Sequence, residues 1–214
     1  MLTSFVSLTN TKTQQAPVKH RHRRRVGIFG GTFNPIHNGQ LIAAEQACTA
    51  LGLDKLYFMP DAIPFAATHD NAVEPSTRAE MIRLAIRGNS KFDIEMKPIH
   101  DGGQQSTFSV MKKLVEEHPE IDYYLIMGSK VFKNFAEWDD ANALSRMVRL
   151  VAIDQPGIQR SIDFPAIWLQ VNWLDISSSD IRSRLRVKQS VRYLIPDMVA
   201  AYIAEFNLYQ GRIY

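Results

Sequence analysis

The chain has 214 residues, of which 45% are hydrophobic and 22% charged, a composition typical of a globular protein with one main domain. No apolar run reaches the roughly 20 residues that a membrane helix needs. The single cysteine, Cys48, excludes an intrachain disulfide and a cysteine-rich zinc site, so we interpret it as a small buried side chain and expect a cytoplasmic protein.

Positive charge is concentrated at the N-terminus. Residues 1–25 contain six Lys/Arg and no acidic residue, whereas residues 26–214 contain 19 Lys/Arg and 22 Asp/Glu and carry a net charge of −3. We interpret 1–25 as a disordered basic tail, because a Ser/Thr/Gln-rich segment with few large apolar side chains cannot offset its ordering entropy. A transit peptide and an arm for an acidic partner or nucleic acid are the alternatives.

Residues 26–214 are predicted to form one domain in which strands alternate with helices. Short apolar runs that end at Gly or Pro predict strands, and apolar residues at three- and four-residue steps predict helices. In chain order, strands are predicted at 25–29, 55–60, 92–96, 123–127, 148–153 and 167–172, and helices at 38–51, 76–87, 107–118, 177–185 and 196–206. This alternation predicts an α/β fold, a Rossmann-like doubly wound parallel sheet with helices on both faces.

The fold class also predicts where a ligand binds. In doubly wound sheets, ligands lie at the carboxyl ends of the strands, near the point where the strand order reverses. The four loops that follow strands there are therefore the candidates: 30–40, 60–75, 128–138 and 172–180.

The first of these loops has the features of a phosphate site. Gly30 and Gly31 are expected to allow a tight turn and a close approach of main-chain N–H groups to a ligand. The next helix begins near Asn38, and its N-terminal amides favour an anion. His37 and Gln40 are three residues apart and are expected to project to one side of the first helical turn. The segment matches neither Gly-x-Gly-x-x-Gly nor the P-loop pattern.

Residues 30–40, Gly-Gly-Thr-Phe-Asn-Pro-Ile-His-Asn-Gly-Gln, resemble the nucleotidyltransferase signature Gly-Gly-Thr-Phe-(Asp/Asn)-Pro-x-His-x-Gly-His at ten of eleven positions. Residues 176–182, Ile-Ser-Ser-Ser-Asp-Ile-Arg, resemble the Ile-Ser-Ser-Thr-x-Ile-Arg of bacterial nicotinate mononucleotide adenylyltransferases. Trp138 stands where that family has a tryptophan that stacks on the pyridine ring. The resemblance extends from Val26 to Tyr209.

The resemblance implies an enzyme of NAD biosynthesis that transfers AMP from ATP to nicotinate mononucleotide, giving deamido-NAD and pyrophosphate. It implies Mg²⁺ on the ATP phosphates and no metal ligand from protein side chains. The catalytic positions it implies are His37, Gln40 and Arg182. The positions implied for ATP and its phosphates are Gly30, Gly31, Thr32, Phe33, Gly128, Ser178 and Ser179. The nicotinate nucleotide is implied at Thr107 and Trp138. Neither nucleic acid nor membrane is expected as a partner, and homo-oligomer formation is left open.

Several site positions depart from the family pattern. The departures are Gln40 for His, Lys130 for Asp, Phe65-Ala66 for His-Lys, Ser106 and Ser109 for Tyr and Asp, and Gln155 for Arg. Two hypotheses follow: a working adenylyltransferase, or a degenerate paralogue that binds a nucleotide without efficient turnover. A related nucleotidyltransferase with a different acceptor is a third. The pair Asp139-Asp140 is interpreted as a helix cap and not as a metal pair.

Overall fold

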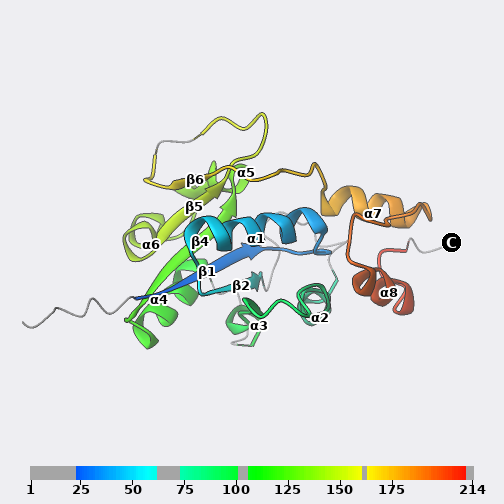
Figure 1. Ribbon diagram of the computed structural model, residues 1–214, viewed down its shortest axis with the longest axis horizontal. Helices are drawn as coiled ribbons and strands as arrows, with labels where there is room; N and C mark the ends of the chain where they lie inside the picture. Colours follow the sequence, from blue (N-terminus) through cyan, green and yellow to red (C-terminus); the bar gives the residue numbers. More distant parts are fainter. Residues whose placement is uncertain (1–22, 62–72, 101–105, 161–162, 211–214) are drawn as a thin grey trace, which may run out of the picture.

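Six parallel strands form one sheet in the computed structural model, which describes residues 23–61, 73–100, 106–160 and 163–210 (Figure 1). The sheet order is β3-β2-β1-β4-β5-β6, so the strand order reverses between β1 and β4. The strands are β1 (Arg24–Gly31), β2 (Lys55–Pro60), β3 (Phe92–Ile94), β4 (Ile121–Gly128), β5 (Arg149–Ile153) and β6 (Ile167–Leu169). This topology confirms the predicted doubly wound parallel sheet.

Helices connect the strands. They are α1 (Asn38–Leu51), α2 (Pro75–Ala85), α3 (Lys97–His100), α4 (Thr107–Glu117), α5 (Ser129–Phe132), the 3-10 turn η1 (Phe135–Glu137), α6 (Ala141–Met147), α7 (Ser178–Arg186) and α8 (Asp197–Glu205). The five predicted helices are confirmed, and α1 has the predicted bounds. A helix also follows Asp139-Asp140, as expected, although Asp140 occupies the cap position without a side-chain cap bond. The short α3, α5 and η1 have no periodic pattern of their own in the sequence.

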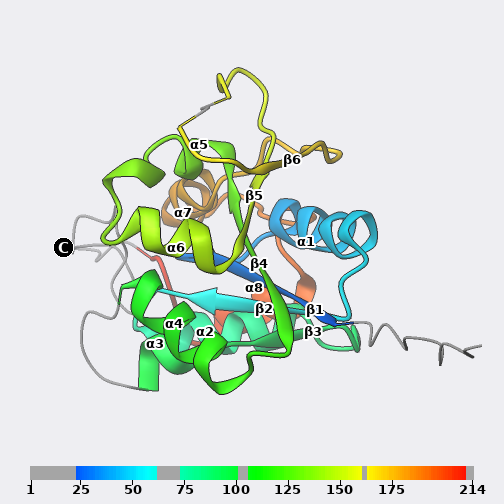
Figure 2. The same cartoon turned by 90° about the vertical axis from the view of Figure 1, so that its left-hand side faces the viewer.

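Alternate residues of β1 face two separate cores. Val26 and Ile28 pack with α4, α5 and α6, whereas Phe29 packs with α1, α2, α7 and α8. Figures 1 and 2 accordingly show α1 and α4 on opposite sides of the sheet. The backbone has no room for a side chain at Gly27, where a Cβ would lie 2.7 Å from Leu53. The continuous apolar run in β1 therefore reflects burial on both faces.

Several strand boundaries differ from their predictions. β1 spans Arg24–Gly31 instead of 25–29, and β4 spans Ile121–Gly128 instead of 123–127. Arg23, which precedes β1, pairs with Asp122 at 2.7 Å. β3 stops at Ile94, because the Glu95 carboxylate accepts the Lys97 N–H and α3 begins there. β6 stops at Leu169, short of residue 172. Residues 1–22 of the predicted tail lie outside the described residues.

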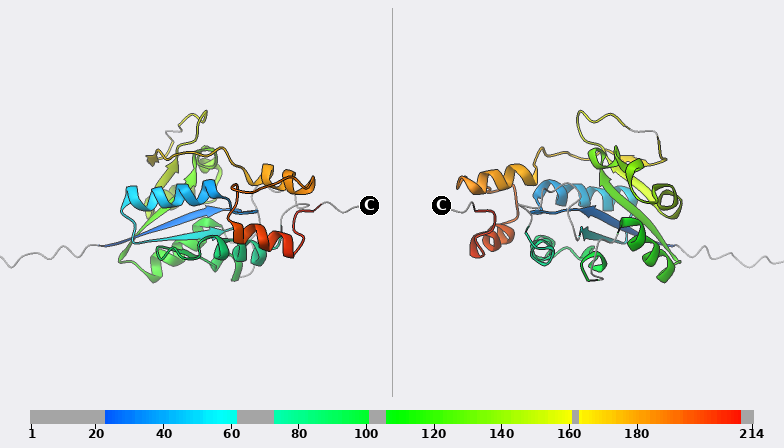
Figure 3. Two further views of the ribbon diagram at one scale, coloured as in Figure 1. Left: turned by 45° about the vertical axis from the view of Figure 1, so that its right-hand side comes forward. Right: turned by 180° about the vertical axis from the view of Figure 1, so that it is seen from behind.

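The carboxyl ends of the strands point toward α7 and α8. In Figure 1 the β1 arrow runs toward this helix pair, and Figure 3 shows both helices beyond the tip of the strand. α8 packs against α2, which also covers β2 and β3. Among the described residues, no helix combines the length and the apolar character needed to cross a membrane. The C-terminal part of the chain is thus placed beside the loop that follows β1.

Candidate active site

The strand-order reversal brings two of the predicted loops together. β1 and β4 are neighbours, and they end at Gly31 and Gly128 respectively. α1 begins at Asn38 after the first loop, and α5 begins at Ser129 directly after β4. Main-chain N–H groups therefore converge at the switch point, as expected for a nucleotide site in this fold.

The tight turn of the first loop is made at Phe33 and not at the glycines. Gly30 and Gly31 are still strand residues, paired with Met59 and Pro60 of β2. Phe33 adopts the left-handed conformation, with φ 49°, and its buried ring packs against neighbouring phenylalanines. The prediction that the glycines form the turn was wrong. Gly31 lies close under the Phe33 ring, since a Cβ there would be 3.1 Å from that ring.

A buried arginine that sequence reasoning did not select holds this loop. Arg78 of α2 is 0% exposed and donates to the carbonyls of Thr32 at 2.7 Å, Asp61 at 2.6 Å and Val73 at 3.2 Å. It therefore joins the loop after β1, the end of β2 and the start of α2. The available sequence signal is its position one turn before Ile82, on the apolar face of the helix.

Asp61 is the second residue of this cluster that was missed. Its carboxylate accepts the Thr32 hydroxyl at 3.2 Å. Burial raises the pKa of Asp61, and the Thr32 hydrogen bond and the Arg78 charge oppose that rise. Burial likewise lowers the pKa of Arg78, which Asp61 partly offsets. A carboxyl group of this kind follows β2 directly, where ligand-side residues of a parallel sheet are found.

His37 and Gln40 form a reciprocal capping box at the start of α1. The Gln40 N–H donates to His37 Nδ1 at 3.3 Å, and the His37 N–H donates to Gln40 Oε1 at 3.2 Å. His37 is 6% exposed, and burial lowers its pKa to about 4. The imidazole is therefore neutral at pH 7, and because Nδ1 accepts, its proton is on Nε2. The box fixes His37 as a hydrogen-bond donor through Nε2.

The predicted residues of α7 lie against the same loop. The Ser178 hydroxyl donates to the Pro35 carbonyl at 2.8 Å, and Arg182 Nη1 donates to the Asn34 carbonyl at 2.8 Å. Arg182 Nε is buried without a partner, and burial lowers the pKa of this guanidinium. Ser179 is exposed on the first turn of the helix. Ser178 and Arg182 thus hold the main chain of the loop, whereas the assignment of Ser179 stays a prediction.

Gln155, one of the departures from the family pattern, joins the loops after β4 and β5. Its Oε1 accepts the Lys130 N–H at 2.9 Å and the Ser129 hydroxyl at 3.4 Å. Its own N–H donates to Ser129 Oγ at 3.1 Å. A Cβ at Gly128 would lie 2.9 Å from Gln155 Oε1, so the glycine permits this close approach. The Lys130 side chain is exposed.

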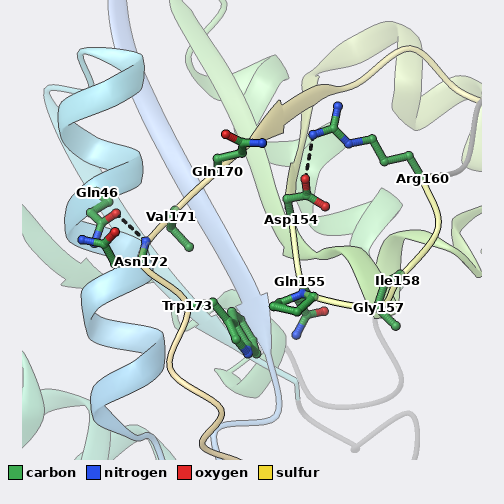
Figure 4. A pocket seen from close by; sticks show the side chains of 11 residues that line it. Gln46, Asp154, Gln155, Gly157, Ile158, Arg160, Gln170, Val171, Asn172 and Trp173 are labelled. Carbon is green, nitrogen blue, oxygen red and sulfur yellow. Dashed lines mark hydrogen bonds and ion pairs between the residues drawn. The ribbon is translucent and has the colours of Figure 1, made fainter.

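A polar hollow of about 610 Å³ adjoins Gln155 between α1 and the loops after β5 and β6 (Figure 4). Asn172 crosses toward α1, where its N–H donates to Gln46 Oε1 at 2.9 Å, and Arg160 pairs with Asp154 at 2.6 Å. The lining residues are Gln46, Asp154, Gln155, Pro156, Gly157, Ile158, Arg160, Gln170, Val171, Asn172 and Trp173. The hollow includes the start of the predicted loop 172–180, but Gln46 and Trp173 were not selected from the sequence.

The two positions assigned to the nicotinate nucleotide lie on the other core. Thr107 is the first residue of α4 and is half-buried. The half-buried Trp138 ends η1, with its ring 5.3 Å from that of Phe135. Ser106 and Ser109 have local roles, because Ser106 Oγ accepts the Ser109 N–H and caps α4. No described contact joins Thr107 or Trp138 to the loop 30–40, and their assignment stays a prediction.

The described residues offer no clear metal site. No group of three or more His, Cys, Asp or Glu side chains suited to a metal ion occurs among the described residues. Asp139 and Asp140 are both exposed. Phe65 and Ala66, which replace a His-Lys pair, lie outside the part of the chain that the structure describes, as does most of the loop 60–75.

Comparison with known proteins identifies the family. The cytidylyltransferase-like family profile matches residues 28–184, which defines the chain as a nucleotidyltransferase of that class. A Lactiplantibacillus plantarum protein described as a probable nicotinate-nucleotide adenylyltransferase is 40% identical, over 96% of this chain and 97% of its own. A Streptococcus mutans protein of the same description is 35% identical, over 90% and 91%. The chain belongs to the nicotinate-nucleotide adenylyltransferase family, which confirms the resemblance.

Solved structures show the same fold. The Plasmodium falciparum nicotinic acid mononucleotide adenylyltransferase complexed with NaAD superposes with a TM-score of 0.74 at 20% identity, covering 87% of this chain and 97% of that one. The same protein complexed with APC has a TM-score of 0.73. At this level of identity, the similarity is one of architecture.

Proposed function

We propose that this protein transfers AMP from ATP to nicotinate mononucleotide, releasing pyrophosphate and forming deamido-NAD. The observation that carries the proposal is the loop 30–40, which presents the neutral donor His37 at the N-terminus of α1, at the switch point of the sheet. Family membership and the close relatives support the choice of acceptor. The lone buried thiol of Cys48 suits a cytoplasmic setting.

The proposed chemistry needs positioning more than covalent catalysis. A phosphate oxygen of nicotinate mononucleotide attacks the α-phosphorus of ATP, and the bond from that phosphorus to the β-phosphate bridge oxygen breaks. His37 Nε2–H donates to the phosphate oxygens as negative charge develops on them. The α1 N-terminus and the main chain of Gly31 to Phe33 add N–H groups and a favourable dipole. Ser179 and Arg182 extend this anion site from α7.

Mg²⁺ is the cofactor we propose, held chiefly by the ATP phosphates, where it would neutralise charge on the transferred group. The donor set is consistent with this arrangement. The Asp61 carboxyl group, which lies beside the loop, accepts the Thr32 hydroxyl. The described residues around it offer hydrogen-bond donors and cations to the phosphates.

Gln40 supports turnover despite replacing a histidine. Its Oε1 is used in the capping box, which leaves the amide NH₂ as a donor on the same turn as His37. The amide cannot carry positive charge, and we assign it a hydrogen bond to phosphate. Trp138 and Thr107 are proposed for the nicotinate nucleotide. A partly buried tryptophan can offer one face to a flat ring, a contact worth about 0.5–1.5 kcal/mol beyond its buried area.

The test is an assay of pyrophosphate and deamido-NAD formation from ATP, Mg²⁺ and nicotinate mononucleotide. We expect turnover, and we expect His37→Asn to lower kcat by about 10²–10³-fold, because one transition-state donor is lost while Asn still caps the helix. No product at high enzyme concentration, with none gained by Gln40→His, would contradict the proposal. Calorimetric ATP binding without turnover would instead support a nucleotide-binding paralogue, and turnover with nicotinamide mononucleotide or another acceptor alone would reassign the substrate.

A further inference from the structure

The C-terminal segment reaches back to the loop through one phenol. Tyr209 follows α8, and its hydroxyl donates to Asn34 Oδ1 at 2.7 Å, although 175 residues separate the two. Asn34 is 3% exposed and lies between the turn residue Phe33 and Pro35. The Val73 N–H approaches the same oxygen at 3.4 Å. The Asn34 side chain is thus a buried acceptor whose shortest described bond comes from Tyr209.

Other main-chain groups of the loop are held by the same part of the molecule. Beyond the carbonyl contacts from Ser178 and Arg182, the Asn38 N–H donates to the Leu194 carbonyl at 2.9 Å. Asn38 Nδ2 donates to the Tyr193 carbonyl at 2.8 Å. Residues 34, 35 and 38 are therefore all bonded to segments between 178 and 209. The Tyr209 hydroxyl adds a further bond to this set, to the side chain of Asn34.

Backbone conformation gives an independent observation. Left-handed φ values occur at six non-glycine residues of the described chain, and four of them belong to this junction: Phe33, Tyr193, Asn207 and Tyr209. Such conformations cost free energy and persist where surrounding contacts hold them. Of the two residues in the contact, Tyr209 itself has a left-handed backbone, and Asn34 directly follows the left-handed Phe33.

Burial keeps the phenol of Tyr209 protonated and therefore a hydrogen-bond donor. Burial raises the pKa of Tyr209 well above its usual range, and the nearby Arg182 and Arg78 oppose that rise. The hydroxyl therefore remains protonated at every pH at which the protein would work. Arg182 and Arg78 are the two guanidinium groups that also hold the carbonyls of Asn34 and Thr32.

We propose that Tyr209 is a positioning residue for the reaction: its hydroxyl fixes Asn34 and thereby sets the main chain of residues 32–34 that faces the phosphates. Tyr209 itself does not contact substrate in this scheme. This proposal rests on the adenylyltransferase activity proposed above. Rate measurements test it through that activity, and hydrogen exchange tests it without any activity.

The first test is Tyr209→Phe, which removes one oxygen and keeps the ring. We expect kcat to fall about 10–100-fold with KM for both substrates within about threefold, because a small displacement of transition-state donors affects the chemical step. Tyr202→Phe is the matched control, since Tyr202 lies on α8, is half-buried and packs on Phe206. That variant should keep the wild-type kcat. A wild-type kcat in Tyr209→Phe would overturn the proposal.

A double-mutant cycle tests whether the two residues act as one unit. Asn34→Ala combined with Tyr209→Phe should lose no more activity than the worse single variant, whereas Asn34→Ala combined with Tyr202→Phe should show the product of the two single losses. If the loss of activity in the Asn34→Ala, Tyr209→Phe double variant equals the product of the two single losses, Tyr209 acts independently of Asn34 and the mechanism is refuted.

Hydrogen–deuterium exchange separates this proposal from the proposed activity. In substrate-free protein, the amides of residues 32–34, 36 and 37 should exchange faster in Tyr209→Phe and Asn34→Ala than in wild type. In Tyr202→Phe their exchange should equal that of the wild type. If the wild-type protein is inactive but the variants show this exchange pattern, the proposed activity is refuted and the hold of Tyr209 on the loop is supported. Unchanged exchange in Tyr209→Phe would refute the positioning role, whatever the activity.

Discussion

At the scale of single residues, His37 combines two properties that usually conflict. It is buried, and in the proposed reaction it offers a hydrogen bond to an anion. The capping box reconciles them, because Gln40 N–H occupies Nδ1 and leaves the proton on Nε2. A neutral imidazole avoids the cost of a buried charge and still donates. In the proposed reaction the histidine therefore acts as an oriented hydrogen-bond donor and not as a positive charge.

The same burial makes stability depend on pH. The folded pKa of His37, about 4, lies below the unfolded value of 6.5. As the pH falls below 6.5, His37 binds a proton in the unfolded state but not in the native state, so the free energy of unfolding decreases. Between pH 7.5 and 5 we expect this site to cost about 2 kcal/mol of unfolding free energy. Urea unfolding at both pH values should show that loss shrinking in His37→Asn. Equal losses in the two proteins would refute the assignment.

At the scale of elements, Arg78 joins β1, β2 and α2 without reaching solvent. Three main-chain carbonyls depend on its guanidinium, and a planar fork with five donors can serve them together. These elements pack in the core around Phe29 and Phe58, so the arginine links the phosphate loop to the apolar interior. A lysine could not replace it, because one ammonium group cannot span the three acceptors.

Replacing Arg78 by methionine should destabilise the protein by about 3–5 kcal/mol, because buried acceptors and the nearby Asp61 would lose their donor and counter-charge. Denaturant unfolding measures this change. Arg83→Ala on the same helix is the control. Its pair with Glu80 is exposed, so we expect a change within about 0.5 kcal/mol. Similar effects of the two substitutions would contradict the role given to Arg78.

At the scale of the whole molecule, Cys48 reports on global unfolding. It lies on α1 in the core between the sheet and the helices, 1% exposed. Burial, chiefly, raises the pKa of its thiol to about 11, with Glu45 contributing in the same direction. Because it is the one cysteine in the chain, any thiol reaction reports on this position alone.

The native protein should therefore react with a disulfide reagent at neutral pH at least about 100-fold more slowly than a free thiol. The pKa of the free thiol is about 8.5, more than two units below that of Cys48, so its thiolate fraction is over 100-fold larger. In urea the rate should rise to that of the free thiol across the same transition that far-UV circular dichroism detects. Rapid labelling in buffer would show that α1 opens without global unfolding.

Element type proved predictable along most of the chain because burial leaves periodic patterns. The bounds of α1 and β2 agree residue by residue, each ended by Gly or Pro. β3 and β6 are shorter than predicted: the Glu95 carboxylate accepts the Lys97 N–H where α3 begins, and the Asn172 N–H donates to Gln46 of α1, 126 residues away. The loop and its histidine were predicted from the sequence, whereas Arg78 and Asp61 were not, because their partners are main-chain carbonyls and a hydroxyl that only folding brings near.

The sequence alone determined the fold class, the family and the position of the phosphate loop, because those depend on local periodicity and on contiguous residues from 30 to 40. The tertiary structure decided how that loop is built. Its turn lies at Phe33 instead of at the glycines, Gln40 accepts the His37 N–H in the capping box of α1, and Gln155 joins two loops. The hold of Tyr209 on Asn34 spans 175 residues. Contacts between such distant segments depend on tertiary packing, which local sequence patterns do not specify.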